Sequence, residues 1–220
     1  MPGRLPLYRP RRVWHVGDLD RPRPRSEGSY EGPGLSISEC PEICAEIARL
    51  PGVTWELHRH DRRRGRFVDY LALSPAERAG LTAAAITAGL LTPTTWFRVT
   101  YRDDDLEDDR VMVFRDRSQA EAEATALNCD DSPTDDAPPA LSDYDGYDAT
   151  PAMHGRWAAH FSGAINDGQC EEMAHLMILA DYDEYDGVWW HERHAPEALS
   201  APRGVIFPAA LGRWARRVAR

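Results

Sequence analysis

The chain is 220 residues long, carries a formal net charge of −10, and 42% of its residues are hydrophobic. A chain of this length can bury a substantial core without disulfides or metals, as one large domain or one domain with an added lobe. The acidic balance argues against general nucleic-acid binding, and no apolar run reaches the roughly 18 residues that a membrane span needs.

Three features of the sequence bear on the setting of the protein. The four cysteines show neither CxxC spacing nor the density of a disulfide scaffold, which predicts a reducing, cytoplasmic location. No apolar segment follows the basic, proline-rich N-terminus, so we expect no signal peptide. The chain contains no lysine, which excludes lysine-amine chemistry and suggests a high-GC bacterium or its phage.

In the first half of the chain we expect strands alternating with helices. The strand patterns lie at residues 13–16, 34–38, 53–57 and 67–73, the last two joined across a basic turn at 58–65. Pro41 suits the first turn of a helix that would end near residue 50. Ser74, Pro75 and Glu77 form a capping box, which predicts a helix to about residue 90.

The second half predicts a strand pair at 96–101 and 110–114 and a short helix at 119–127. Residues 128–150, rich in Asp, Pro, Ser and Tyr, indicate an acidic flexible insertion or linker. Beyond it we expect helices at 154–161 and 170–180, buried strands at 188–190 and 204–207, and a terminal helix at 208–218. Alternation predicts that Trp189 and Trp190 point to opposite faces, one of them under a helix or a substrate.

These elements indicate an α+β protein with a mixed split sheet of short strands and flanking helices. Residues 1–127 and 151–220 would together form one domain, with 128–150 as the insertion.

The stretch from residue 13 to 50 is the strongest candidate for a binding site. A strand ending in His15-Val16-Gly17 is followed by a loop, then by Gly32-Pro33-Gly34-Leu35-Ser36, and then by the helix that begins at Pro41. Glycines allow sharp bends or close approach to a ligand, and a helix N-terminus can receive an anion. The pattern therefore favours a nucleotide-type ligand.

This order of elements resembles the NAD-binding half of mono-ADP-ribosyltransferases of the bacterial and phage toxin or effector type. A second segment, Tyr185-Asp186-Gly187-Val188 followed by a strand at 203–207, is similar to the strand pair that closes the sheet in several such proteins. The two matching segments, about 13–50 and 170–211, cover roughly a third of the chain.

The resemblance implies that NAD is the substrate and that ADP-ribose is transferred to a protein or nucleic-acid acceptor. His15 would hold the adenosine-side ribose, Tyr30 or Ser36 would lie near nicotinamide, and the other candidate contacts are Gly17, Gly34 and Ser38. The family's glutamate, which polarises the ribose 2′-hydroxyl, would begin the last strand, but residues 200–204 hold no carboxylate. The candidates in its place are Glu192 and Glu31, with Asp186 as a third.

Other interpretations stay open at this point. Each candidate carboxylate could be a solvated or structural group, and His15 could be an ordinary hydrogen-bonded histidine at a strand end. The pairs His58/His60 and His191/His194 are interleaved with arginine, which disfavours a dication, so we expect no metal site. As an alternative function, the acidic region 103–148 could contact a basic partner in a non-enzymatic interaction or inhibitor protein of a mobile element.

Overall fold

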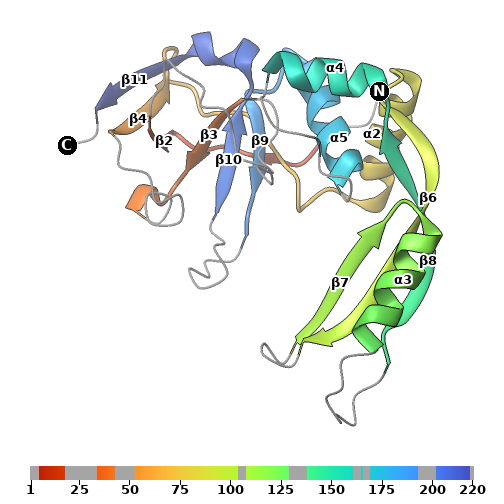
Figure 1. The fold of residues 1–220 in the computed structure, drawn as a ribbon. Helices are drawn as coiled ribbons and strands as arrows, with labels where there is room; N and C mark the ends of the chain where they lie inside the picture. The colour runs from red at the N-terminus through yellow and green to blue at the C-terminus, as the bar shows by residue number, and fades with distance from the viewer. Residues whose placement is uncertain are drawn as a thin grey trace. The chain divides into compact units, whose positions relative to one another are not determined.

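The computed structural model describes residues 5–17, 34–42, 53–103, 108–128, 138–160, 165, 169–192 and 202–218. The chain divides into two compact units (Figure 1). The large unit comprises Met1–Leu90 and Ala149–Arg220, and the small unit comprises Leu91–Asp148.

The large unit is built on an eight-stranded sheet in the order β1-β5-β9-β10-β3-β2-β4-β11. Its strands are β1 (Leu7–Tyr8), β2 (Arg12–Val16), β3 (Leu35–Ser38), β4 (Thr54–Arg59), β5 (Phe67–Asp69), β9 (Gly187–Trp190), β10 (Arg203–Ile206) and β11 (Trp214–Val218). All neighbouring strands pair antiparallel except β5 and β9, which are parallel. The segments expected to match, around β2–β3 and β9–β10, therefore form four adjacent strands.

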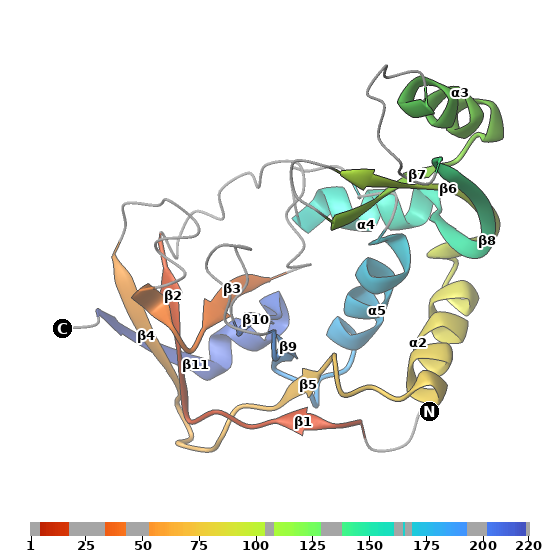
Figure 2. The same ribbon diagram turned by 90° about the horizontal axis from the view of Figure 1, so that it is seen from below.

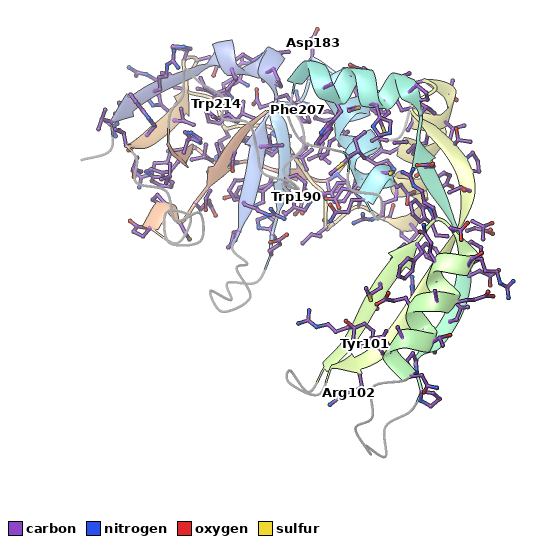
Figure 3. The ribbon with its side chains drawn as sticks, in the orientation of Figure 1. Tyr101, Arg102, Asp183, Trp190, Phe207 and Trp214 are labelled. Carbon is purple, nitrogen blue, oxygen red and sulfur yellow. The ribbon has the colours of Figure 1, made fainter. Side chains whose placement is uncertain are left out.

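Side-chain alternation gives this sheet two buried faces. Val188 and Val205 pair across β9 and β10. Together with Trp190 they lie on the face that helix α5 (Cys170–Ala180) covers, here called the helix-side face. Trp189 and Phe67 lie on the opposite face, here called the inner face, and both are fully buried. The prediction that the two tryptophans point to opposite faces agrees with this register, and Figure 3 labels Trp190 on its strand.

Three helices complete the large unit: α2 (Pro75–Thr87), α4 (Pro151–His160) and α5 (Cys170–Ala180). The predicted capping box of α2 is present, because the Ser74 hydroxyl accepts a hydrogen bond from the Glu77 amide and the Glu77 carboxylate accepts one from the Ser74 amide. In Figure 2, α5 lies between α2 and the strands β9 and β5. It covers the helix-side face, where Trp190 Nε1 donates a 2.8 Å hydrogen bond to Glu172 of α5.

The small unit is a three-stranded sheet in the order β7-β6-β8 with one helix. Its elements are β6 (Leu91–Asp103), β7 (Asp108–Phe114), α3 (Arg117–Asn128) and β8 (Ala140–Ala149). Trp96, Val99 and Ala120 supply its core. Figure 3 labels Tyr101 and Arg102 near the C-terminal end of β6.

Two expectations about the order of the chain are corrected. Residues 140–149, expected to be part of a flexible linker, form β8, because Trp96 of β6 packs there and donates a hydrogen bond from its Nε1 to the carbonyl of Tyr147. The domain boundaries also differ from the expectation. Residues 91–127 belong to the small unit and not to a domain shared with 151–220.

The expected terminal helix is a short 3-10 turn, Pro208–Arg213, followed by strand β11. Trp214 and Val218 lie on the same side of this strand, and Trp214 is buried against the ring of Phe67. The strands β4 and β5, which the sequence joined across the basic turn, are not paired with each other, since β5 pairs with β1 and β9. No helix in the described part of the chain is long and apolar enough to cross a membrane.

Candidate functional site

His15 lies on β2, next to the end of the strand, and reaches across to β3. Its Nδ1 is 2.7 Å from the backbone carbonyl oxygen of Ser36, so it donates a hydrogen bond that fixes the plane of the imidazole ring. The bond joins the two elements that carry the resemblance. A Cβ added at Gly17 would lie 3.5 Å from Nε2 of the same ring.

The side chains of His15 and Ser36 do not share a face, contrary to the expectation that both contact one NAD molecule. Trp14 pairs with Ser38, so those two side chains lie on one face, and Ser36 lies there too because it is two residues away. His15 follows Trp14 and points to the opposite, inner face. Within one strand the sequence predicts that side chains alternate between the two faces of the sheet. The pairing between strands decides which side chains share a face.

The two candidate glycines at the described strand ends have structural roles. Gly17 has a φ of 127°, its amide donates to the Val53 carbonyl, and its own carbonyl accepts a 2.9 Å hydrogen bond from Trp55 Nε1. At Gly34 an added Cβ would lie 2.1 Å from the backbone oxygen of Ile206. The absence of a side chain at Gly34 therefore lets β3 approach β10, not a ligand.

Ser38 is 1% exposed and its hydroxyl is fully engaged within the protein. It donates a 2.9 Å hydrogen bond to the carbonyl of Pro202 and accepts one of 2.9 Å from the amide of Cys40. These bonds join the end of β3 to the start of β10. Ser38 therefore stabilises the frame of the candidate site, and its hydroxyl is not directed at a ligand.

Glu192 follows β9 and lies at the end of the sheet near the start of β10. It forms a 3.0 Å salt bridge with Arg203, and both side chains are 26% exposed. The Arg203 guanidinium lies 5.6 Å from the ring centre of Trp190, whose indole binds Glu172. Burial raises the pKa of Glu172, against the effect of its hydrogen bond from Trp190. The helix-side face thus holds two carboxylates around one arginine.

A carboxylate that the sequence analysis did not select lies on the same face as His15. Glu39, which follows β3 directly, accepts a hydrogen bond from the hydroxyl of Tyr8. Tyr8 packs against Trp189 of the inner face at 4.8 Å between ring centres, and edge-on against His191 at 4.7 Å. Burial and the neighbouring Glu39 raise the pKa of Tyr8. In the sequence Glu39 is a single acidic residue between a strand and the helix expected at Pro41, and such a position does not indicate a functional role.

Asp186 of the Tyr185-Asp186-Gly187-Val188 segment is a structural residue. It is 0% exposed and accepts two 2.7 Å hydrogen bonds from Arg59 and one of 2.9 Å from the Arg66 amide. A carboxylate held this way has no approach for a substrate, so Asp186 is removed from the candidate acids.

Several expected features lie outside the described residues: Tyr30, Glu31, the segment Gly32-Pro33 and the helix beyond Glu42. Among the residues that the structure does describe, no group of three metal-ligating side chains comes together.

Two polar features were missed because their parts are far apart in sequence. His175, 1% exposed, lies in a buried network with Tyr70 and Thr82. The sequence feature that could have indicated this network is a histidine within the apolar pattern of residues 170–180. The second feature is a hollow lined by arginines from two separate loops, of which the basic turn at 58–65 was the visible part.

Comparison with protein-family models, with curated proteins and with solved structures finds no match to this chain.

Proposed function

We propose that the chain binds NAD and transfers ADP-ribose to a macromolecular acceptor. The observation that carries the proposal is the assembly of the two resembling segments into four adjacent strands in the order β9-β10-β3-β2. These segments are more than a hundred residues apart in the chain, and each resembles the family through a motif of its own. Their direct pairing, Gly204 with Ile37 and Trp14 with Ser38, is what a single site would require.

In this proposal His15 contacts the adenosine-side ribose from the inner face. Its hydrogen bond to the Ser36 carbonyl holds the ring in one orientation and one tautomer, as a ligand-binding histidine needs. The serine side chains take no part, because they lie on the other face or are bonded within the protein.

A carboxylate must act at the nicotinamide ribose, where positive charge develops as the glycosidic bond breaks. Glu192 stays a candidate for this role at the strand end beside Arg203, although Arg203 lies on the helix-side face, so the ligand would have to pass around the end of the sheet from His15. β9 is three strands from β2, or about 14 Å at roughly 4.8 Å per strand, which an extended dinucleotide could span. Glu39 is the second candidate because it shares the face of His15.

The test combines NAD binding by calorimetry with chromatographic measurement of released nicotinamide. The native protein should bind NAD and release nicotinamide slowly, with water replacing the acceptor. His15→Ala should weaken NAD binding by roughly tenfold, the order of one lost polar contact. Glu192→Gln should retain NAD binding and lower turnover by about a hundredfold or more.

Two matched variants separate the possible results. His154→Ala, at an exposed position on α4, should leave both measurements unchanged. If Glu39→Gln lowers turnover and Glu192→Gln does not, Glu39 is the acid. Failure of the native protein both to bind NAD and to release nicotinamide would show that the proposal is wrong.

A second candidate function, capture of a basic partner, is favoured by the small unit. Residues 91–148 contain sixteen acidic residues and five arginines, and they form a compact unit of their own. An arginine-rich peptide should bind to the protein with an affinity that falls steeply as salt is raised. Asp143→Asn combined with Asp145→Asn should weaken this binding, whereas no effect of that pair would contradict a role for β8.

A further inference from the structure

Six arginines from two segments of the large unit surround one hollow of about 540 Å³. The lining residues are Arg9, Arg11, Arg62, Arg63, Arg64 and Arg66. The first two follow β1, and the other four belong to the connection between β4 and β5. The amide of Gly65 donates a 2.8 Å hydrogen bond to the carbonyl of Pro10, so the backbone itself holds the two segments together.

The positive charge of the hollow is poorly balanced by its neighbours. Arg66 lies 3.4 Å from Glu184, and Arg63 lies 3.9 Å from Asp61, a carboxylate that Arg59 already binds at 2.9 Å. The side chains of the other four arginines make no ion pair with any residue that the structure describes. Gathering guanidinium groups without counter-charges is unfavourable, so a ligand that supplies negative charge would relieve the repulsion.

The net charge of the whole chain does not describe this region. The sixteen acidic residues and five arginines of the small unit leave twenty acidic residues and twenty-one arginines in the large unit. The large unit is therefore close to neutral overall, and six of its twenty-one arginines line the hollow. The acidic charge balance that disfavours nucleic-acid binding is a property of the chain average and not of this surface.

We propose that the hollow binds the phosphodiester backbone of a single nucleic-acid strand. Guanidinium groups bind phosphate oxygens through paired N–H donors, and their planes can also stack on unpaired bases. A concave basic surface suits one strand that passes through it, with one negative charge per nucleotide. Six arginines exceed what one small anion would neutralise.

The hollow is distinct from the proposed NAD site. Arg11 lies just before β2 and His15 lies four residues further on, about 13 Å away at roughly 3.3 Å per residue. β2 and β4 are antiparallel, with Arg12 opposite His58 and His15 opposite Trp55, so the arginine loops lie at the opposite end of the pair from Gly17. The two proposals can therefore fail separately.

The test measures fluorescence anisotropy of a labelled single-stranded DNA of about 20 nucleotides between about 50 and 200 mM salt. Each phosphate contact contributes a salt slope of about −0.7, so six contacts would give a slope near −4. Arg11→Gln combined with Arg64→Gln removes one arginine from each segment. It should reduce the slope by about 1.4 and weaken binding about 25-fold near 0.1 M salt.

Arg117→Gln combined with Arg217→Gln is the matched control, because both residues are exposed arginines in ion pairs outside the hollow. This control should bind the DNA like the native protein, and melting curves should show that both double variants are folded. Absence of DNA binding at low salt, or equal binding by both double variants, overturns the proposal. So does equal competition by polyglutamate or by tripolyphosphate at matched charge, because the hollow would then recognise acidic peptide or a small anion instead.

Discussion

Arg59 of β4 contacts Asp186, the residue before β9, although three strands separate β4 from β9 in the sheet. In a flat sheet four strand spacings would hold them about 19 Å apart, whereas Arg59 Nη1 lies 2.7 Å from both oxygens of the Asp186 carboxylate. The sheet must therefore curl around its inner face. The rings of Phe67 and Trp214, from strands still further apart, meet at 5.7 Å inside the curl.

Asp186→Asn should strongly destabilise the large unit. The substitution removes the fully buried counter-charge of Arg59, whose side chain is 14% exposed, and weakens the bond to the Arg66 amide. Loss of one partner from a buried ion pair typically lowers the free energy of unfolding by about 3–5 kcal/mol. Urea unfolding followed by tryptophan fluorescence measures the change.

Asp61→Asn is the internal control, because Asp61 binds the same arginine but its side chain is 41% exposed. An exposed ion pair is screened by water and contributes little to stability, so the shift should be small. Equal shifts for the two substitutions would contradict the view that burial makes the Arg59–Asp186 pair important for closing the sheet.

Gly187→Ala should prevent β9 and β10 from pairing in their present register. A Cβ at this position would lie 1.7 Å from the backbone oxygen of Val205, a contact that only movement of a strand could relieve. We expect little folded protein on expression. Gly155→Ala is the matched substitution, in α4 with no atom within 4 Å of the added Cβ, and it should stabilise the fold by about 0.5–1 kcal/mol. A well-folded Gly187→Ala protein with an unchanged melting temperature would show that this strand contact is wrong.

Trp96→Phe should loosen the small unit selectively. The substitution removes the hydrogen bond from Nε1 to the Tyr147 carbonyl and reduces the volume of a side chain that is 2% exposed. Because the Tyr147 carbonyl loses its hydrogen bond, the free energy of unfolding of the small unit should fall by about 1–3 kcal/mol. Amide hydrogen exchange should become faster in β6 and β8 while α5 keeps its protection. Equal acceleration in both units would mean that they unfold together.

The parts of the fold that the sequence predicted are those whose cause is local. The helix behind Ser74 follows from a capping box of four residues, and β2 and β3 follow from short apolar patterns. β11 was missed because residues 208–218 have apolar spacing that also suits a helix. Its strand conformation depends on pairing with β4, some 150 residues earlier in the chain.

The candidate site shows the same limit. The sequence placed His15 and Ser36 in one candidate site, and their strands are neighbours in the sheet. The side chains lie on opposite faces because Trp14 pairs with Ser38, and no local pattern predicts that register. Asp186 was selected for its carboxylate, whereas its role depends on an arginine 127 residues away. Long-range pairing of this kind leaves no local pattern.

His175 should make the stability of the large unit depend on pH. The Thr82 hydroxyl has one proton, which it donates to Glu171 or to the Arg78 carbonyl, so it accepts the Nε2–H of His175 at 2.8 Å. The other ring nitrogen then accepts from the Tyr70 hydroxyl at 3.0 Å. The network therefore suits the neutral ring.

Burial, followed by the nearby Arg78, lowers the pKa of His175 from 6.5 to about 4. Between those values the unfolded chain binds more protons than the native protein, so stability rises with pH across that window and is lost as the pH falls through it. Between about pH 7.5 and pH 5.5 the free energy of unfolding lost through this residue is on the order of 1 kcal/mol. Urea unfolding of the native protein and of His175→Gln at both pH values measures it, because glutamine does not titrate. The native protein should lose more stability than the variant by that amount, and equal losses would mean that His175 is not held neutral.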